Sequence, residues 1–274
     1  MRTKITASIV LFNNDLKIIN EAIHSFFNTD VEVHLYLIDN SPTDVLKELK
    51  TNNRMTYIHN PSNPGFGAAH NVALEKAMQE GSQYHFIVNP DAYFTSDIIT
   101  PMVTYMCQNP DIGMMMPQVL NEDGTIQNLP KLLPSPYSIL MRKLKKPTLL
   151  YTNFINKYEL RFVPQDKIYN APILSGCFTL LNLAAIKQVG MYDDAYFMYF
   201  EDWDLSRRMH TKYKTIYYPL VSVYHGYESG ANKSSRLFKI FLKSAMTYFN
   251  KWGWFFDKNR KRINKQALAQ FKNA

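Results

Sequence analysis

The sequence contains few cysteines and no long apolar run. Cys107 and Cys177 are the only cysteines among 274 residues, which excludes a disulfide framework and a cysteine-rich metal cluster and fits a reducing cytosol. We expect both to be small core residues. The longest apolar stretches, such as 178–186, are far shorter than the roughly 20 residues that cross a bilayer. The early apolar run stops at Asn13 without a cleavage signature, and so predicts a first strand rather than a signal peptide.

Acidic residues are almost missing from the end of the chain. Residues 233–274 hold 11 of the 31 Lys and Arg residues but one of the 23 Asp and Glu residues, and four aromatic residues lie at 252 and 254–256. A basic and aromatic tail suits the interface of an anionic membrane, or it packs its apolar face on the rest of the chain. Nucleic acid is a poorer partner, because residues 1–232 are slightly acidic and show no known binding module.

The first half of the chain alternates between strand and helix patterns, which indicates an α/β fold with a mostly parallel sheet and helices on both faces. Apolar runs predict buried strands, and apolar residues at helical spacing predict the helices between them. The predicted strands are 5–12, 33–38, 55–59 and 84–88, and the predicted helices are 16–27, 45–49 and 68–78.

Polar residues follow three of these strands. Asn13, Asp39 and Asp91 each come just after a predicted strand. Ligands of such sheets bind beyond the carboxyl ends of the strands, so we expect these side chains to share one site. The alternative is that each one caps the helix that follows it.

The second half is less regular. The segment Asn121–Asn170 carries five prolines and a basic run, and predicts an insertion or a mobile flap over the site. After it we expect a strand at 173–181, helices at 183–189 and 202–209, and a strand pair at 215–225 that is broken at Pro219.

Two further segments contain residues suited to ligand binding. The loop 60–71 contains Gly65 and Gly67 and leads into a helix, an arrangement that lets a backbone approach phosphate or a sugar hydroxyl. It is not a dinucleotide fingerprint, and a plain turn and helix cap is the alternative. Glu201 and Asp202 form an acidic cluster at a predicted helix start, where they could instead pair with Arg207 and Arg208.

The ordered set of motifs resembles family 2 glycosyltransferases, most closely the rhamnosyl- and galactofuranosyltransferase-like branch, over roughly residues 3–230. The motifs that carry the resemblance are Asp39-Asn40-Ser41, Asn63-Pro64-Gly65-Phe66-Gly67 with Asn71, Asn89-Pro90-Asp91, Gly190-Met191-Tyr192-Asp193 and Phe197 to Asp204. The resemblance implies a Rossmann-like GT-A fold, a nucleotide-sugar donor and inversion at the anomeric carbon. It suggests a catalytic domain at 1–232, with a nucleotide half at about 1–120 and an acceptor half at about 171–232, and a helical extension at 233–274.

Carried over residue by residue, the resemblance assigns a donor site. Asp39 resembles the acid that accepts the imide N–H of uracil or thymine. Asp91 resembles the last acid of the Asp-X-Asp motif that holds Mg²⁺ or Mn²⁺ on the diphosphate, and His225 resembles a downstream histidine that completes this site. Asn89 replaces the first acid, which puts metal dependence in doubt, although magnesium is often held by one or two carboxylates. The remaining donor-site residues are Phe12, Asn13, Gly65, Gly67 and Asn71.

The resemblance also assigns the acceptor side. Asp202 matches the catalytic base, because a carboxylate opposite the leaving diphosphate can take the proton of the acceptor hydroxyl. Glu201 would orient the acceptor, and Trp203 offers an apolar face to a sugar ring. No Gln-X-X-Arg-Trp motif follows, which favours transfer of a single residue over chain synthesis.

The sequence therefore predicts an inverting, non-processive transferase in cell-surface polysaccharide assembly. It would move one sugar, with rhamnose favoured, from a UDP- or dTDP-sugar to a saccharide acceptor that is lipid-linked, on the cytoplasmic face of the cell membrane. Two alternatives are a sugar-phosphate nucleotidyltransferase and a membrane-associated, non-catalytic binding module. The oligomeric state stays open.

Overall fold

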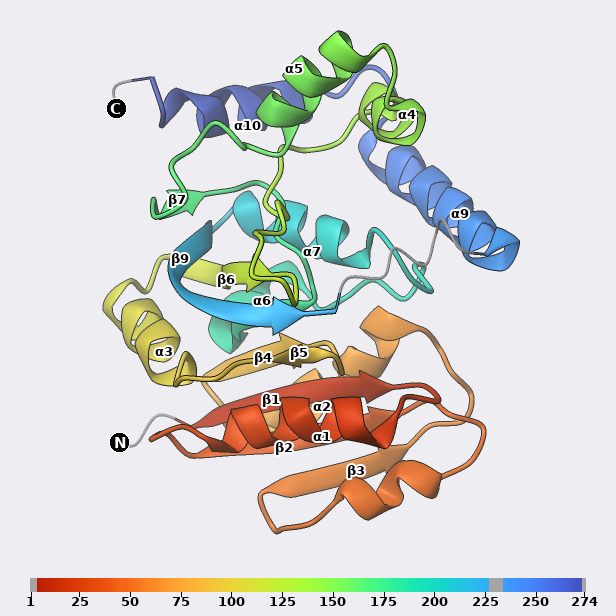
Figure 1. Cartoon of the computed structure of the whole chain (residues 1–274), viewed down its shortest axis with the longest axis vertical. Coiled ribbons are helices and arrows are strands. Elements are labelled where there is room, and N and C mark those ends of the chain that lie inside the picture. Colours follow the sequence, from red (N-terminus) through yellow and green to blue (C-terminus); the bar gives the residue numbers. More distant parts are fainter. Residues whose placement is uncertain (1–3, 227–233, 273–274) are drawn as a thin grey trace.

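The computed structural model describes residues 4–226 and 234–272, and shows one mixed sheet of nine strands with helices packed around it (Figure 1). The strand order is β3-β2-β1-β4-β8-β6-β9-β5, and β7 pairs with β9. The predicted α/β class is confirmed. The strands are β1 (Ile5–Leu11), β2 (Val33–Asp39), β3 (Met55–His59), β4 (Tyr84–Val88), β5 (Ala92–Tyr93), β6 (Ile112–Leu120), β7 (Tyr169–Asn170), β8 (Phe178–Asn182) and β9 (Lys214–His225).

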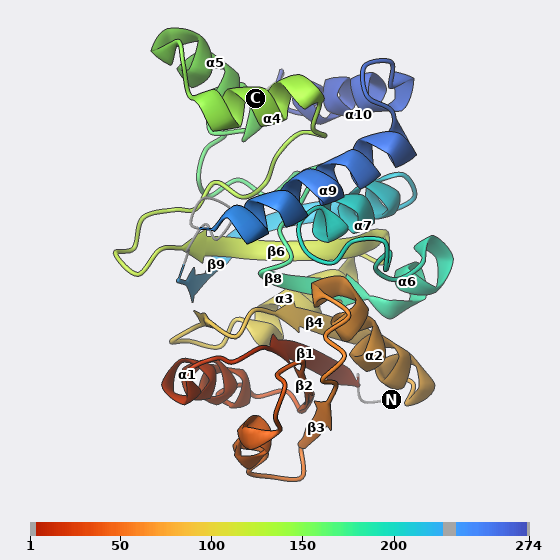
Figure 2. The same ribbon diagram turned by 90° about the vertical axis from the view of Figure 1, so that its right-hand side faces the viewer.

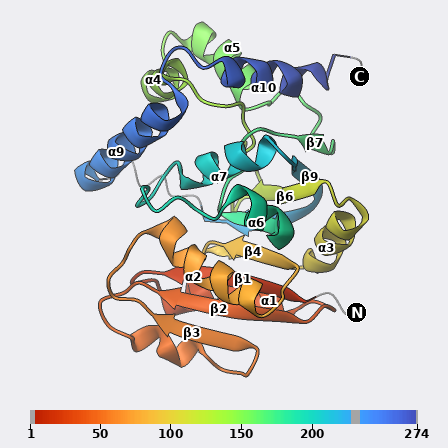
Figure 3. The same cartoon turned by 180° about the vertical axis from the view of Figure 1, so that it is seen from behind.

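The N-terminal half is a parallel layer, because each of its strands is followed by a crossover. β1 lies between β2 and β4, and β2 pairs with β3, all in parallel. Helices α1 (Leu16–Phe27) and α2 (Phe66–Gln79) cover opposite faces of this layer, and the short helix η1 (Val45–Leu49) joins β2 to β3 (Figures 1 and 3). The carboxyl ends of β1 to β4 therefore meet at one edge, as the strand pattern predicted.

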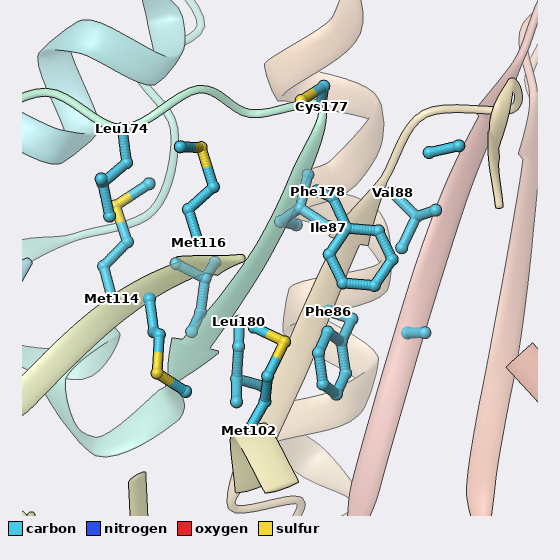
Figure 4. Packing of buried hydrophobic residues seen from close by; sticks show 14 of the residues in the cluster. Phe86, Ile87, Val88, Met102, Met114, Met116, Leu174, Cys177, Phe178 and Leu180 are labelled. Carbon is cyan, nitrogen blue, oxygen red and sulfur yellow. The ribbon is translucent and has the colours of Figure 1, made fainter. Parts of the chain in front are cut away.

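The second half adds strands in both directions. β8 pairs antiparallel with β4 and with β6, and it begins five residues later than the predicted strand 173–181. Phe86 of β4 lies against Phe178 of β8, with ring centroids 5.7 Å apart, and methionines of β6 fill the space beyond them (Figure 4). This apolar seam joins the two halves into one core.

The predicted strand pair at 215–225 is wrong, because the segment is the single strand β9. Its register against the parallel strand β6 shifts twice, and at the second shift Tyr218 pairs with Pro117 while Ser222 pairs with Gln118. Pro219 has no N–H to donate to a neighbouring strand. The residues between these pairs bulge out of the ladder, and the strand continues to His225.

The segment 121–170, which the sequence predicted as an insertion or a mobile flap, is more regular than its prolines suggested. It contains α4 (Pro136–Leu144) and α5 (Thr148–Tyr158), which pack on each other. Two of the prolines that suggested irregular structure lie at helix starts, where the missing N–H has no intrahelical partner. Pro136 is the first residue of α4 after the capping residue Ser135, and Pro147 precedes α5.

The C-terminal tail forms α9 (Ser235–Trp252) and α10 (Lys258–Ala269), and the predicted boundary at 232/233 lies outside the described residues. Helix α9 lies alongside α7 (Glu201–His210) (Figure 2). Tyr248 and Phe249 of α9 are buried in a cluster with Tyr196 and Phe200. The tail therefore packs its apolar side on the rest of the chain.

Other expectations from the sequence differ from the structure in detail. Helix α3 (Ile99–Gln108) and strand β6 were not predicted, while α6 (Leu183–Val189) was. Cys177 is buried as expected, but Cys107 is exposed at the end of α3. Across the part of the chain that the structure describes, no helix combines the length and the hydropathy needed to cross a bilayer.

Candidate active site

The predicted nucleotide pocket lies where β1, β2 and β3 end. Asn40 N–H donates to Leu11 O, and Asn13 N–H donates to the hydroxyl of Ser41. The Asn13 backbone is left-handed, with φ of 51°, a conformation that asparagine tolerates well. The structure thus brings Asn13 and Asp39-Asn40-Ser41 together.

The carboxylate of Asp39 is buried and has two internal donors. Its Oδ1 accepts from Ser41 N–H at 2.9 Å, and its Oδ2 accepts from the Tyr57 hydroxyl at 2.6 Å. Asp39 is fully buried, whereas Phe12, which follows the Leu11 that pairs with Asp39 across the sheet, is half exposed. Tyr57, which the sequence interpretation missed, is therefore a direct partner of the Asp39 carboxylate.

The glycine loop packs against this chain's own backbone. A Cβ on Gly65 would lie 2.2 Å from Phe197 O, and one on Gly67 would lie 2.9 Å from Tyr192 Cβ. The side chain of Asn71 donates to Tyr192 O and Asp194 and accepts from Tyr192 N–H. These three residues hold α2 against the segment that leads to α7, which fixes where the acidic cluster begins.

Asn89, Asp91 and His225 converge although 134 residues separate Asp91 from His225. Asn89 Nδ2 lies 3.0 Å from His225 Nε2, and Asp91 Oδ1 lies 3.4 Å from the same nitrogen. Gln127 Nε2 donates to His225 O, so its Oε1, 3.3 Å from His225 Nδ1, is the acceptor of an Nδ1–H. In that tautomer Nε2 accepts a hydrogen bond from the Asn89 amide, with Asp91 Oδ1 nearby.

These residues fit a divalent cation shared with substrate phosphates. Burial lowers the pKa of His225 despite the opposing charge of Asp91, so the imidazole is neutral and can act as a ligand. Asp91 and His225, with Oδ1 and Nε2 3.4 Å apart, are the two side chains that would hold such a cation. Within residues 4–226 and 234–272 there is no cluster of three or more His, Cys, Asp or Glu residues for a metal, so the phosphates would supply the remaining ligands.

A short chain of hydrogen bonds links this region to Asp202. Asn89 N–H donates to Cys177 O at 2.8 Å, and the neighbouring Gly176 N–H donates to Asp202 Oδ2 at 3.1 Å. Burial raises the pKa of the Cys177 thiol, and the charges of Asp91 and Asp202 raise it further. Residues 176–177, just before β8, therefore connect the segment of Asn89 to the acidic cluster.

Two left-handed residues present the acidic cluster. Tyr199 and Phe200 have φ of 70° and 68°, and Phe200 is the N-cap of α7. Such a backbone is strained for an aromatic residue, by about 1–3 kcal/mol each, and persists only where packing enforces it. Phe200 is buried against Tyr248 and Phe241 of α9, with ring centroids 5.5 and 5.3 Å away. The tail therefore supports the turn from which Glu201 and Asp202 project.

Glu201 is buried, Asp202 is partly buried, and the charge of Asp202 perturbs Glu201. Burial raises the pKa of Glu201 well above its usual range, and the charge of Asp202 raises it further. Burial also raises the pKa of Asp202, while the Gly176 N–H and the Lys131 ammonium oppose that shift. Glu201 Oε2 has no hydrogen-bond partner within the described residues. Glu201 is thus the protonated member of the pair and Asp202 the one that ionises first.

Lys131 is a site residue that the sequence did not reveal. Its backbone pairs with Ile173 through two hydrogen bonds of 3.1 Å, and its side chain is buried with Nζ 5.7 Å from the Trp203 ring centre. Burial lowers its pKa to about 8, against the opposing effect of Glu159 and Asp202. Trp203 is partly buried and also packs against a cluster that contains Leu133 and Ile263. No local motif marks Lys131, because only the pairing with Ile173 brings it here.

Comparison with known proteins identifies the family. The family model described as glycosyl transferase family 2 matches residues 7–190, which is more than half of the chain. This chain belongs to glycosyltransferase family 2. The structure and the family together make it a glycosyltransferase with a GT-A fold, as the motifs predicted.

Curated relatives in family 2 include rhamnosyltransferases. The chain is 25% identical over 225 residues to an N-acetylglucosaminyl-diphospho-decaprenol L-rhamnosyltransferase of Mycobacterium tuberculosis, covering 76% of this chain and 72% of that protein. It is 24% identical over 211 residues to the rhamnosyltransferase WbbL of Escherichia coli, covering 73% and 75%.

Solved structures agree on the fold of this family 2 enzyme. S. aureus TarS 1–349 in complex with UDP matches with a TM-score of 0.60 at 13% identity, over 99% of this chain and 72% of that chain. GalNAc-T7 with UDP, GalNAc and Mn²⁺ matches with a TM-score of 0.61 at 15% identity, over 83% of this chain and 44% of that chain. The chain thus spans less than half the length of GalNAc-T7.

Proposed function

We propose that this glycosyltransferase inverts the anomeric carbon and moves one sugar, rhamnose in our preferred assignment, from a dTDP- or UDP-sugar to a lipid-linked saccharide acceptor. It would act at the cytoplasmic face of a cell membrane in polysaccharide assembly. The observation that carries the proposal is that residues 176–177 bond both to Asn89 of the diphosphate side and to Asp202. The names of the two rhamnosyltransferase relatives support the choice of sugar, and one supports a diphospho-lipid acceptor.

The reaction is a single displacement. Ionised Asp202 takes the proton of an acceptor hydroxyl as its oxygen bonds to the anomeric carbon, and the bond to the nucleoside diphosphate breaks on the opposite side. Asp91 and His225 would hold Mg²⁺ or Mn²⁺, which supplies positive charge to the departing diphosphate when bound. Phe12, Asn13 and Asp39 would bind the base and ribose, Gly65, Gly67 and Asn71 shape the adjoining loop, and Trp203 would face the acceptor sugar. These roles remain predictions.

Nucleotide binding is the first test. We expect dTDP and UDP to raise the melting temperature more than GDP does, with a further rise on addition of Mn²⁺, because a ligand at about 100 times its Kd stabilises the native state by about 2.7 kcal/mol. Asp39→Asn should reduce the response, since an amide in place of the carboxylate loses the charged acceptor. The exposed Asp166→Asn is the control. An equal response to all three nucleotides in wild type would contradict the base assignment.

The pH profile tests Lys131. Asp202 must be ionised, so transfer rises as pH increases through its pKa, which Lys131 lowers. Lys131→Met should therefore move the acidic limb of kcat to higher pH, with activity recovering on the alkaline side. The exposed Lys187→Met, which removes the same charge on α6, should leave the limb in place. A uniform loss of activity at every pH would assign Lys131 a structural role instead.

We also propose that the tail docks the enzyme on an anionic membrane surface through residues 233–274. Leu242, Met246, Phe255 and Phe256 are among its large apolar residues that stay exposed, and two lysines lie between them in the sequence. Exposed apolar side chains beside cations suit the boundary between lipid headgroups and acyl chains.

A further inference from the structure

A cavity lies outside the site described above, between the α4–α5 pair and α10. It has a volume of about 640 Å³ and occupies the end of the molecule opposite β3, where α4, α5 and α10 gather in all three views (Figures 1–3). This volume is in the range of sites for small organic ligands.

The lining of the cavity is cationic without acidic residues. Five basic residues line it and no Asp or Glu does. Arg260 is used internally, since its guanidinium bonds to backbone carbonyls and lies 3.9 Å from Asp257. The other four are lysines that form no ion pair with any residue in 4–226 or 234–272, namely Lys157, Lys261, Lys265 and Lys272. Four unpaired cations around one space make a binding site for an anion.

A buried hydroxyl in the wall lacks a partner. Tyr158 is 3% exposed, and its OH has no hydrogen-bond partner among the described residues. A buried hydroxyl without a partner costs free energy unless something occupies its donor position. Phe154 stacks on Tyr158 with centroids 5.3 Å apart, and Leu132, Leu133 and Leu268 complete an apolar wall. The ligand that fits is therefore both anionic and apolar.

Exposed apolar side chains lie on α4 and α5, two helices that line the cavity, and we call them the apolar rim. Five apolar residues on α4 and α5 are each more than half exposed: Tyr137, Leu140, Leu144, Leu149 and Leu150. Phe255 and Phe256, in the loop before α10, are also exposed. The charge of the cavity and the apolar rim beside it complement a phosphate group and a hydrocarbon chain, respectively.

We propose that this cavity binds the terminal phosphate or diphosphate of a membrane lipid, whose chain lies over the exposed leucines of α4 and α5. The lipid is the carrier of the acceptor, so in this respect the inference rests on the proposed function. Leu132 and Leu133 line the cavity, while the adjacent Lys131 faces Asp202 and Trp203. The wall of the cavity is thus the back of the acceptor side of the active site.

The test is binding of the full chain to phosphatidylcholine vesicles that carry a polyprenyl phosphate. Lys261→Gln/Lys265→Gln removes two cavity cations, and Lys258→Gln/Arg262→Gln removes two charges from the same helix outside the cavity lining. We expect the cavity variant to bind roughly tenfold more weakly, since hydrogen bonds between charged groups are lost, and the control variant to change by about twofold at most. Equal weakening of both variants would overturn the proposal.

Further measurements distinguish polyprenyl phosphate from other anions that could bind in the cavity. Phosphatidylglycerol vesicles of matched surface charge should bind more weakly than polyprenyl phosphate vesicles and respond equally to both double variants. Equal affinity of wild type for the two lipids would overturn the assignment, and so would full competition by inorganic phosphate at the concentration of the lipid. Tyr158→Phe should weaken lipid binding without lowering the melting temperature, because it removes a hydroxyl that has no partner.

Failure of the proposed function gives a different result. The melting-temperature response to dTDP and UDP is measured on the same samples, and neither double variant should alter it. Loss of the nucleotide response in wild type would refute the transferase assignment of the donor, while lipid binding with the expected difference between variants would still support the cavity.

Discussion

Replacing Asp202 with asparagine is expected to lower kcat by roughly 10²–10⁴-fold, the contribution that a positioned general base makes. The amide keeps the shape of the side chain and one acceptor for the Gly176 or Trp203 N–H, but it cannot take a proton. Binding of the donor nucleotide should stay unchanged, because the hydrogen bonds of Asp39, Asn89 and His225 do not involve Asp202. The measurement is kcat for transfer together with the melting-temperature response to nucleotide.

Glu201→Gln is the matched control for Asp202→Asn. Burial keeps Glu201 protonated by raising its pKa, so its amide analogue resembles the state already present. We expect a much smaller loss of kcat than for Asp202→Asn. Full turnover by Asp202→Asn, or a larger loss in Glu201→Gln, would remove Asp202 from the role of base.

Arg207→Met is expected to lower the free energy of unfolding by about 3 kcal/mol, because it removes the closer ion-pair partner of the buried Asp257 and leaves the longer contact with Arg260 at 3.9 Å. Arg207 Nη2 lies 2.7 Å from Asp257 Oδ2, and both side chains are at most 3% exposed. The guanidinium also lies over Trp252, 4.2 Å from the ring centre. This pair joins the helix that carries Asp202 to the loop between α9 and α10. The measurement is the midpoint and slope of urea unfolding.

Two variants control this prediction. Arg207→Met/Asp257→Asn removes both charges while keeping a residue that can cap α10, so it should be less destabilised than the single variant. Lys214→Met breaks the ion pair with Asp111, in which both side chains are more than half exposed, and should cost about 1 kcal/mol or less. A similar midpoint for Arg207→Met and Lys214→Met would show that the buried pair contributes little.

The sequence predicted those parts of the fold and site that depend on local patterns. The alternation of strands and helices placed Asn13, Asp39 and Asp91 at strand ends, and the structure joins the ends of β1 and β2 through Asn13 and Ser41. His225 reaches Asn89 and Asp91 because β9 continues past Pro219, which the sequence interpretation took as a break.

The site residues that the sequence did not reveal reach the site through tertiary contacts. Lys131 and Gln127 lie in a proline-rich segment without periodicity, and they reach the site through bonds to Ile173 and His225. Tyr57 looked like a strand residue, and only the parallel pairing of β3 with β2 brings its hydroxyl to Asp39. The prolines of 121–170 suggested irregular structure. A proline that begins a helix cannot be distinguished from one that breaks a helix unless the capping residue before it is known.

The aromatic contacts of α9 with Phe200 bear on how this enzyme could be recombined with others. A chimaera that joined residues 4–226 to the C-terminal segment of another transferase would keep every donor-side residue and still lose the rings that hold Phe200 left-handed. The backbone before Asp202 would then relax from its left-handed conformation, and the position of the Asp202 carboxylate would change. A chimaera that is meant to keep this site should therefore take residues 190–210 and α9 from the same parent protein.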